Sequence, residues 1–503
     1  MEGWIILVSS FCYLSLLFAI AYYGDKRADG GRSIISNPYV YSLSLAVYCT
    51  AWTFYGNIGS VVRDGFSYLP IYLGPTLMAS IWWIVLRKII RISKTHHLTS
   101  IADFISSRYG KSTLLGSLVA VIAVAGIVPY ISLQLKAISV SFRVIGEYPH
   151  VDIPAFSGNV FILQDTAFYV TLILIAFALL FGTRHLDATE RHEGVVAAIA
   201  FESIIKLLSF LILGVFVTYW MFDGFADIFS QAQTSYSHLF VMPASQGAYS
   251  DWVWLTVISM MAIMFLPRQF QVSIVENVNE SHLKKAIWLF PLYLLLINIF
   301  VLPIAFGGLL SLPGREVEAE YFGLMLPLLE NNPVIALIVY IGGLSAATSM
   351  VIVSSIALST MICNELVMPV LFRSPFWDLS ERADMSRLIL RIRRGSIVFV
   401  LMLGYIYVHF ISKQAPLVSI GLVSFTAVAQ FGPAILGGVY WKKGTRAGAL
   451  SGLIAGFLIW GYTLVIPSLD QAGLVPHGLL ADGPFGIQWL SPLQLFGLTE
   501  YNS

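Results

Sequence analysis

Long apolar runs follow one another along the chain, and short polar or basic stretches separate them. A helix that crosses a bilayer needs about 20 apolar residues, because it rises about 1.5 Å per residue and the hydrocarbon core is about 30 Å thick. We therefore expect about twelve spanning helices. They are predicted at residues 4–23, 39–61, 66–90, 114–142, 166–182, 194–221, 252–271, 286–309, 334–363, 388–411, 416–440 and 446–466.

Composition agrees with a lipid environment. Of the 503 residues, 57% are hydrophobic and 11% are charged, whereas soluble domains carry about 25% charged residues. A formal net charge of +1 gives no reason to expect nucleic acid as a partner. The three cysteines have no metal-binding spacing, and no catalytic motif is present. We expect an all-α membrane protein without a cofactor, and no enzyme in this stretch.

The basic residues predict an orientation. Most of the 29 Lys and Arg residues, Arg268 among them, fall in loops on one side if the N-terminus is extracytoplasmic, and cytoplasmic loops carry the excess of positive charge. Lys136 and Lys206 are exceptions within predicted helices, and Lys136 is close enough to the outer end to reach the interface. We expect residues 467–503 to form an extracytoplasmic tail that leads to a thirteenth helix beyond Ser503.

Polar residues and glycines interrupt the second predicted span at "CTAWTFYGNIGS" (49–60). Non-helical backbone at membrane depth is tolerated where it is buried in protein or lines a cavity, and broken helices form the binding sites of many secondary transporters. Alternatively, the glycines allow close helix packing. These residues alone leave both interpretations open.

Three stretches resemble the sodium:solute symporter family: "THHLTSIADFISSRYG" (95–110), "GGLSAATSMVIVSS" (342–355) and "FGPAILGGVYWKKGTRAGALSGLIAG" (431–456). The last is the most specific, because six of its residues have the family's spacing: Pro433, Gly437, Gly438, Trp441, Thr445 and Gly448. The resemblance implies a transporter domain at residues 1–466. Its core, at about 39–440, is expected to be LeuT-like, with five plus five inverted helices.

Within that family, "PYISLQLKAI" (129–138) and residues 49–60 resemble the membrane region of CbrA-type sensor histidine kinases. This implies the bacterial cytoplasmic membrane, C-terminal kinase modules in a longer parent, and a response regulator as partner. The implied function is import of a small solute, an amino acid and most specifically histidine. The alternative is a sodium-coupled symporter for proline or a short carboxylate such as acetate, without a signalling role.

The resemblance also implies a cation site. Its oxygens are expected from the backbone carbonyls of Ala46, Cys49 and Ala346 and from the hydroxyl of Ser349, with a second hydroxyl at position 350. Met350 stands there instead, and a thioether is a poor ligand for a hard cation. We therefore expect a degenerate sodium site and a proton, rather than sodium, as the coupling ion.

Two charged residues lie deep in the predicted helix 194–221. Glu202 and Lys206 are four residues apart and share one helix face. Glu202 lies about 14 Å into a core about 30 Å thick, where charged groups are costly and mark ion pathways. We expect Glu202 to be the protonatable coupling group and Lys206 to tune its proton affinity. The alternative is a neutralising pair that holds helices together.

Solute contacts are implied by family geometry on three predicted helices, namely the interrupted one, the helix at 114–142 and the helix at 416–440. The expected solute-binding residues are Thr50, Trp52, Thr53, Tyr55, Tyr130, Gln134, Ser424, Phe425 and Gln430.

Overall fold

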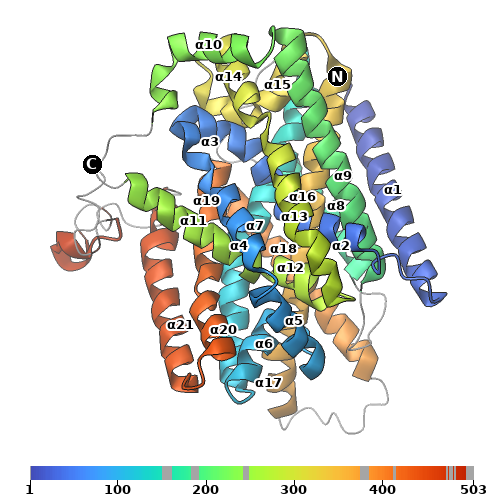
Figure 1. The fold of residues 1–503 in the computed structure, drawn as a ribbon, viewed down its shortest axis with the longest axis vertical. Helices are drawn as coiled ribbons and strands as arrows, with labels where there is room; N and C mark the ends of the chain where they lie inside the picture. Colours follow the sequence, from blue (N-terminus) through green and yellow to red (C-terminus); the bar gives the residue numbers. More distant parts are fainter. Residues whose placement is uncertain are drawn as a thin grey trace.

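The computed structural model describes residues 2–149, 161–182, 192–241, 248–373, 385–411, 415–471, 474, 480, 483–493 and 495. Across these residues the regular structure is helical, without a strand. Long helices run side by side through a bundle, and shorter helices cover its two ends (Figure 1). About half of the predicted tail at 467–503 lies outside the described residues.

The described residues form ten helices of thirteen or more residues, and nine of these belong to no bent pair. They are α1 (Gly3–Asp29), α7 (Thr113–Gly146), α8 (Thr166–Gly182), α9 (Glu193–Phe216), α13 (Leu283–Asn298), α16 (Pro333–Met361), α18 (Met385–Phe410), α19 (Leu417–Ala429) and α21 (Arg446–Trp460). Helix α11 (Ala248–Phe265) belongs with them by length but is bent against its successor.

Other helices are shorter. They are α2 (Pro38–Ser44), α3 (Asn57–Asp64), α4 (Pro70–Ile81), α5 (Val85–His96), α6 (Ile101–Arg108), α10 (Phe225–Ser235), α12 (Pro267–Phe270), α14 (Val301–Ser311), α15 (Phe322–Leu329), α17 (Met368–Arg373), α20 (Phe431–Tyr440) and α22 (Ile466–Gln471). Tighter or wider helical turns connect several of them, including η1 (Leu45–Tyr48), η2 (Trp52–Gly56), η5 (Val217–Met221), η7 (Gln271–Val275), η10 (Ile362–Val367) and η11 (Gly461–Val465).

The chain crosses a membrane several times. Among the described residues, seven helices are long and apolar enough to span one, or up to nine if each bent pair counts as one span. The bent pairs are α4 with α5, at 67°, and α11 with the helix at 267–275, at 49°. The prediction of a multi-pass all-helical protein is confirmed. The count of twelve is not confirmed, because a run of apolar residues does not reveal where a helix bends or breaks.

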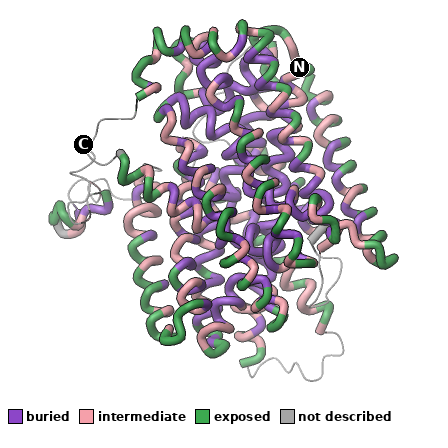
Figure 2. Tube along the Cα trace, in the orientation of Figure 1, coloured by how far each residue is buried: buried purple, intermediate pink, exposed green. Residues whose placement is uncertain are grey.

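Helices α7, α9 and α16 form the centre of the bundle. Helix α16 packs against α9, α7 and α18, while α9 also packs against α1 and α2, and α7 against α19. Buried residues concentrate along this middle, whereas α21 at one edge is largely exposed (Figure 2). Polar groups on the central helices must therefore find partners within the protein.

The family-like stretches have a structural role. Thr445 is the N-cap of α21, and its Oγ1 accepts the backbone N–H of Gly448 at 3.1 Å. The carbonyl of Gly438 accepts a hydrogen bond from Arg108 Nε at 3.0 Å, and a Cβ on Gly438 would lie 2.9 Å from the Arg108 Cβ. The first and last of the three stretches therefore contact each other, and this close contact explains Gly438. Thr445 is explained by its role as the N-cap of α21.

A substitution at Gly343 of α16 can test how the second predicted span packs. A Cβ at this position would overlap the ring of Tyr55 in η2. Overpacking of a core costs about 1–3 kcal/mol. We expect Gly343→Ala to lower the thermal unfolding temperature of the detergent-solubilised protein. Gly461→Ala is the matched control, because nothing lies within 4 Å of a Cβ there. Equal unfolding temperatures for the two variants would mean that η2 does not pack against α16 as described.

Candidate solute and cation site

The second predicted span is broken. Helix α2 and the turn η1 lead to Cys49, whose ψ of 103° is extended. Cys49 and Thr50 are not helical, and helix resumes at Ala51 and continues as the wide turn η2. A break frees backbone groups from the regular helical ladder. The structure therefore favours the interpretation of residues 49–60 as a discontinuous helix over that of glycines serving only close packing.

The ammonium of Lys206 lies at this break. Lys206 is fully buried on α9, and its Nζ donates hydrogen bonds to the carbonyl oxygens of Ala46 and Cys49, each at 2.7 Å. These are two of the three carbonyls that were expected to hold the coupling ion. Sequence spacing placed Lys206 deep in the membrane but gave no signal for these partners.

Glu202, one turn earlier on α9, faces α16 instead. Its Oε1 accepts a hydrogen bond from Thr348 Oγ1 at 2.5 Å, and its backbone carbonyl accepts one from Ser345 Oγ at 2.9 Å. Glu202 and Lys206 are both described, and they form no ion pair with each other. The neutralising pair considered as the alternative is therefore not a direct ion pair. A proton-carrying role for Glu202 and a tuning role for Lys206 stay predictions.

The expected ion ligands on α16 do not contact the ammonium. Ser349 Oγ donates to the backbone carbonyl one turn earlier in its own helix, at 3.1 Å, and lies 3.4 Å from the carbonyl oxygen of Ala346. Met350 is fully buried. Within the described part of the chain, no hydrogen bond joins Lys206 to Ala346 or Ser349. Among the described residues, the hydrogen bonds of the ammonium go to the broken span.

Side chains of helix α7 also form hydrogen bonds with residues at the break. The hydroxyl of Tyr130 lies 3.0 Å from Thr50 Oγ1, and Gln134 Oε1 accepts the backbone N–H of Ala51 at 3.0 Å. All three side chains are buried. Polar groups of α7 thus provide partners that an unbroken helix would have supplied itself.

Three aromatic rings contact one another beside the chain break. We call Trp52, Tyr130 and Phe425 the aromatic cluster. Their centroids are 4.7 Å apart for Trp52 and Phe425, 5.8 Å for Tyr130 and Phe425, and 6.0 Å for Trp52 and Tyr130. Each ring is at most 2% exposed. The structure therefore brings these residues together with Thr50 and Gln134, and their role in binding a solute stays a prediction.

The remaining expected solute residues are more dispersed. Thr53 is buried in η2, and Ser424 is buried beside Phe425 with an Oγ that has no hydrogen-bond partner among the described residues. Tyr55 packs against Tyr321, with ring centroids 5.6 Å apart. Gln430, between α19 and α20, faces α21. The described contacts of Tyr55 and Gln430 thus lie with other elements than the aromatic cluster.

Sequence reasoning missed Arg268. It was expected in a cytoplasmic loop, but it is fully buried, and its guanidinium carbon lies 4.3 Å from the centroid of the Tyr130 ring. The reason is Pro267, which begins α12 after the non-helical Leu266 and directs the chain back into the bundle. A proline directly before an arginine at the end of an apolar run was the available signal.

Lys136 also differs from expectation. It was expected to extend to the interface, yet it is 6% exposed and its Nζ donates a hydrogen bond to the carbonyl oxygen of Ala415 at 2.6 Å. A backbone acceptor inside the bundle makes the reach to water unnecessary.

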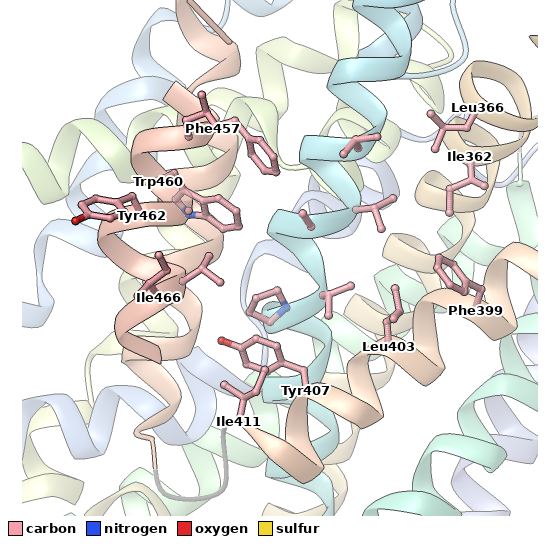
Figure 3. A pocket seen from close by; sticks show the side chains of 18 residues that line it. Ile362, Leu366, Phe399, Leu403, Tyr407, Ile411, Phe457, Trp460, Tyr462 and Ile466 are labelled. Carbon is pink, nitrogen blue, oxygen red and sulfur yellow. The ribbon is translucent and has the colours of Figure 1, made fainter. Parts of the chain in front are cut away.

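A large apolar cavity lies elsewhere, between α7, α18 and α21 with η11, and has a volume of about 820 Å³. Figure 3 shows Phe457 and Trp460 on one side of it and Phe399, Leu403 and Tyr407 on the other. A polar solute that entered this cavity would lose its hydration without gaining partners. We therefore place the candidate solute site at the chain break.

Comparison with known proteins relates the chain to membrane transporters. The sequence model of the sodium:solute symporter family matches residues 29–143. An uncharacterized symporter, YhjB, of Bacillus subtilis (strain 168) is 25% identical over 86% of this chain and 81% of its own. The high-affinity proline transporter PutP of the same organism is 22% identical over 88% of this chain and 89% of its own.

Among solved structures, a Na⁺-coupled sialic acid symporter in a substrate-bound, outward-open state has a TM-score of 0.61 at 14% identity. The match covers 94% of this chain and 98% of that one, so the two share a fold. Together these matches confirm the resemblance of the chain to the sodium:solute symporter family, and with it a multi-pass membrane protein of the solute-transporter type.

Proposed function

We propose that this chain imports a small polar solute as a secondary transporter, with an amino acid as the solute class and histidine as the first candidate. The observation that carries the proposal is the chain break, where backbone groups, buried hydroxyls and the aromatic cluster meet. The ends of half-helices offer N–H and C=O groups suited to a carboxylate and an ammonium. The aromatic cluster offers ring faces against which an imidazole can stack.

We infer further that transport does not use sodium at the family's site. The Lys206 ammonium already binds the carbonyls of Ala46 and Cys49, so sodium would have to displace a tethered cation. Met350 offers sulfur where sodium requires oxygen. A proton is then the coupling ion, and Glu202, buried and bound by Thr348, is the group proposed to carry it.

A second candidate function is a sodium-coupled carrier of proline or a short carboxylate such as acetate. The relative named as a proline transporter favours it. The proposal also includes a sensor role, in which a longer parent passes solute occupancy to kinase modules and a response regulator. That part rests on the resemblance of residues 49–60 and 129–138 to CbrA-type kinases.

The test is uptake of radiolabelled histidine, proline and acetate, in parallel, by protein reconstituted into liposomes. We expect histidine to accumulate under an inward proton gradient in sodium-free buffer, because the cation at the break belongs to the protein itself. A protonophore should abolish this accumulation. A sodium gradient at equal pH on both sides should produce none.

Each other outcome has a definite meaning. Accumulation that requires sodium refutes proton coupling, accumulation of proline or acetate in place of histidine selects the second candidate, and no accumulation at all refutes transport. A double variant, Lys206→Ala with Met350→Ser, removes the ammonium and adds an oxygen, so any uptake it retains should depend on sodium. The single variant Met350→Ser is the matched control and should remain sodium-independent.

The role of Glu202 is tested by Glu202→Gln, which retains an oxygen for the Thr348 hydroxyl but cannot carry a proton. We expect uptake under a proton gradient to fall to the level seen without a gradient, while histidine binding at fixed pH persists. Uptake in liposomes and equilibrium binding in detergent are the two measurements. Undiminished gradient-driven uptake would assign the proton to another group.

A further inference from the structure

A buried guanidinium lies beside the chain break without a hydrogen-bond acceptor. Arg268 is fully buried, and its Nε, Nη1 and Nη2 have no hydrogen-bond partner among the described residues. Arginine stays protonated in proteins and carries five N–H donors in a planar fork. Burial of an unpaired charge is costly, so this position requires an explanation beyond packing.

The backbone directs Arg268 to this place. Leu266 is non-helical, with a ψ of 130°, and the chain bends by 49° between the helices at 249–265 and 267–275. Helix α12, which carries Arg268, packs against η1 and α16. A break in one span therefore points the guanidinium at the break in another.

The described surroundings of Arg268 do not satisfy it. The face of Tyr130 lies 4.3 Å from the guanidinium carbon, and this cation–π contact occupies a face of the guanidinium while its N–H groups point from the edge. Lys206 is a second fully buried cation, and it is hydrogen-bonded to the same chain break. The buried carboxylate of Glu202 accepts its hydrogen bond from Thr348. Among the described residues, two buried cations and one buried carboxylate thus lie around the break, and this excess of positive charge attracts an anion.

We propose that Arg268 binds the carboxylate of the transported solute. The proposal rests on the transport function argued above and narrows the substrates to small solutes that bear a carboxylate. The planar fork matches a carboxylate with two parallel hydrogen bonds. Tyr130 contacts Arg268 and belongs to the aromatic cluster, so a solute held at its carboxylate would place its remaining atoms against Trp52 and Phe425.

The experiment compares solutes that differ by the carboxylate: histidine with histamine, proline with pyrrolidine, and acetate with ethanol. Thermal stabilisation of the purified protein in detergent is measured for each, and the stabilising acid is then titrated to obtain its affinity. We expect an acid to stabilise the wild type and its partner without the carboxylate to have no effect. Arg268→Gln should weaken the affinity for the acid by at least roughly 30-fold, the effect of losing a buried charged hydrogen bond.

A matched control is Arg91→Gln. Arg91 pairs with Glu280, with Nε 2.6 Å from Oε2, and its side chain is 59% exposed. Loss of this guanidinium should leave the affinity for the acid unchanged. Arg268→Lys retains the charge without the fork and should bind the acid more weakly than the wild type. If neither Arg268 variant folds, the comparison of acids with their partners on the wild type decides.

Three results would overturn the proposal: equal stabilisation by acids and their partners, stabilisation that survives Arg268→Gln, or no stabilisation of the wild type by any acid. The uptake assay reports separately on transport. Uptake without a preference for acids would refute the proposed role of Arg268 and would leave the proposed transport function intact. Acid-selective stabilisation lost in Arg268→Gln, with no uptake, would keep the carboxylate site and refute transport.

Discussion

The pairing of the Ala46 and Cys49 carbonyls with the Lys206 ammonium is the interaction on which the centre of this protein depends. The Ala46 carbonyl also accepts the backbone N–H of Cys49 at 3.0 Å, whereas the Cys49 carbonyl lies at the break itself, and a buried carbonyl needs a partner where water is excluded. Lys206 reaches both at 2.7 Å, which fixes α9 against η1. Glu202 on the same helix then accepts its hydrogen bond from α16. One helix thus joins the broken span to the helix with the small residues.

Those small residues have a packing role around the break. Gly343 of α16 lies against the Tyr55 ring and Gly421 of α19 against the Trp52 ring, each so close that a Cβ would overlap the ring. Bulky rings of a broken span have no regular groove to occupy, so the neighbouring helices provide room by omitting side chains. The composition of "GGLSAATSMVIVSS" (342–355) reflects this room as well as its hydroxyl groups.

Features that depend on local sequence were predictable, and features that depend on tertiary partners were not. Thr50 and the nearby glycines marked the position of the break, although a broken helix and close glycine packing both stayed open from the sequence. The spacing of Lys206 and Glu202 indicated a shared helix face. The carbonyl partners of Lys206, however, lie 160 and 157 residues away in the chain, so the sequence could not indicate them. Arg268 looked like a loop residue, because hydropathy does not reveal that Pro267 turns the chain inward. The span count was uncertain for the same reason.

The presence of Met350 at the expected cation site can be explained by the presence of Lys206. A sodium ion requires several oxygens around it, and a helix without a hydroxyl at position 350 would bind it poorly. A lysine ammonium has three N–H donors and a covalent tether, so two carbonyls of the broken span already engage most of its donors. Once the cation is supplied by α9, no oxygen is needed from position 350. The thioether of Met350 is then free to pack in the core, where it is fully buried. We propose that an oxygen at position 350 and a lysine at position 206 are alternative solutions to the same electrostatic requirement, and that this chain has the second.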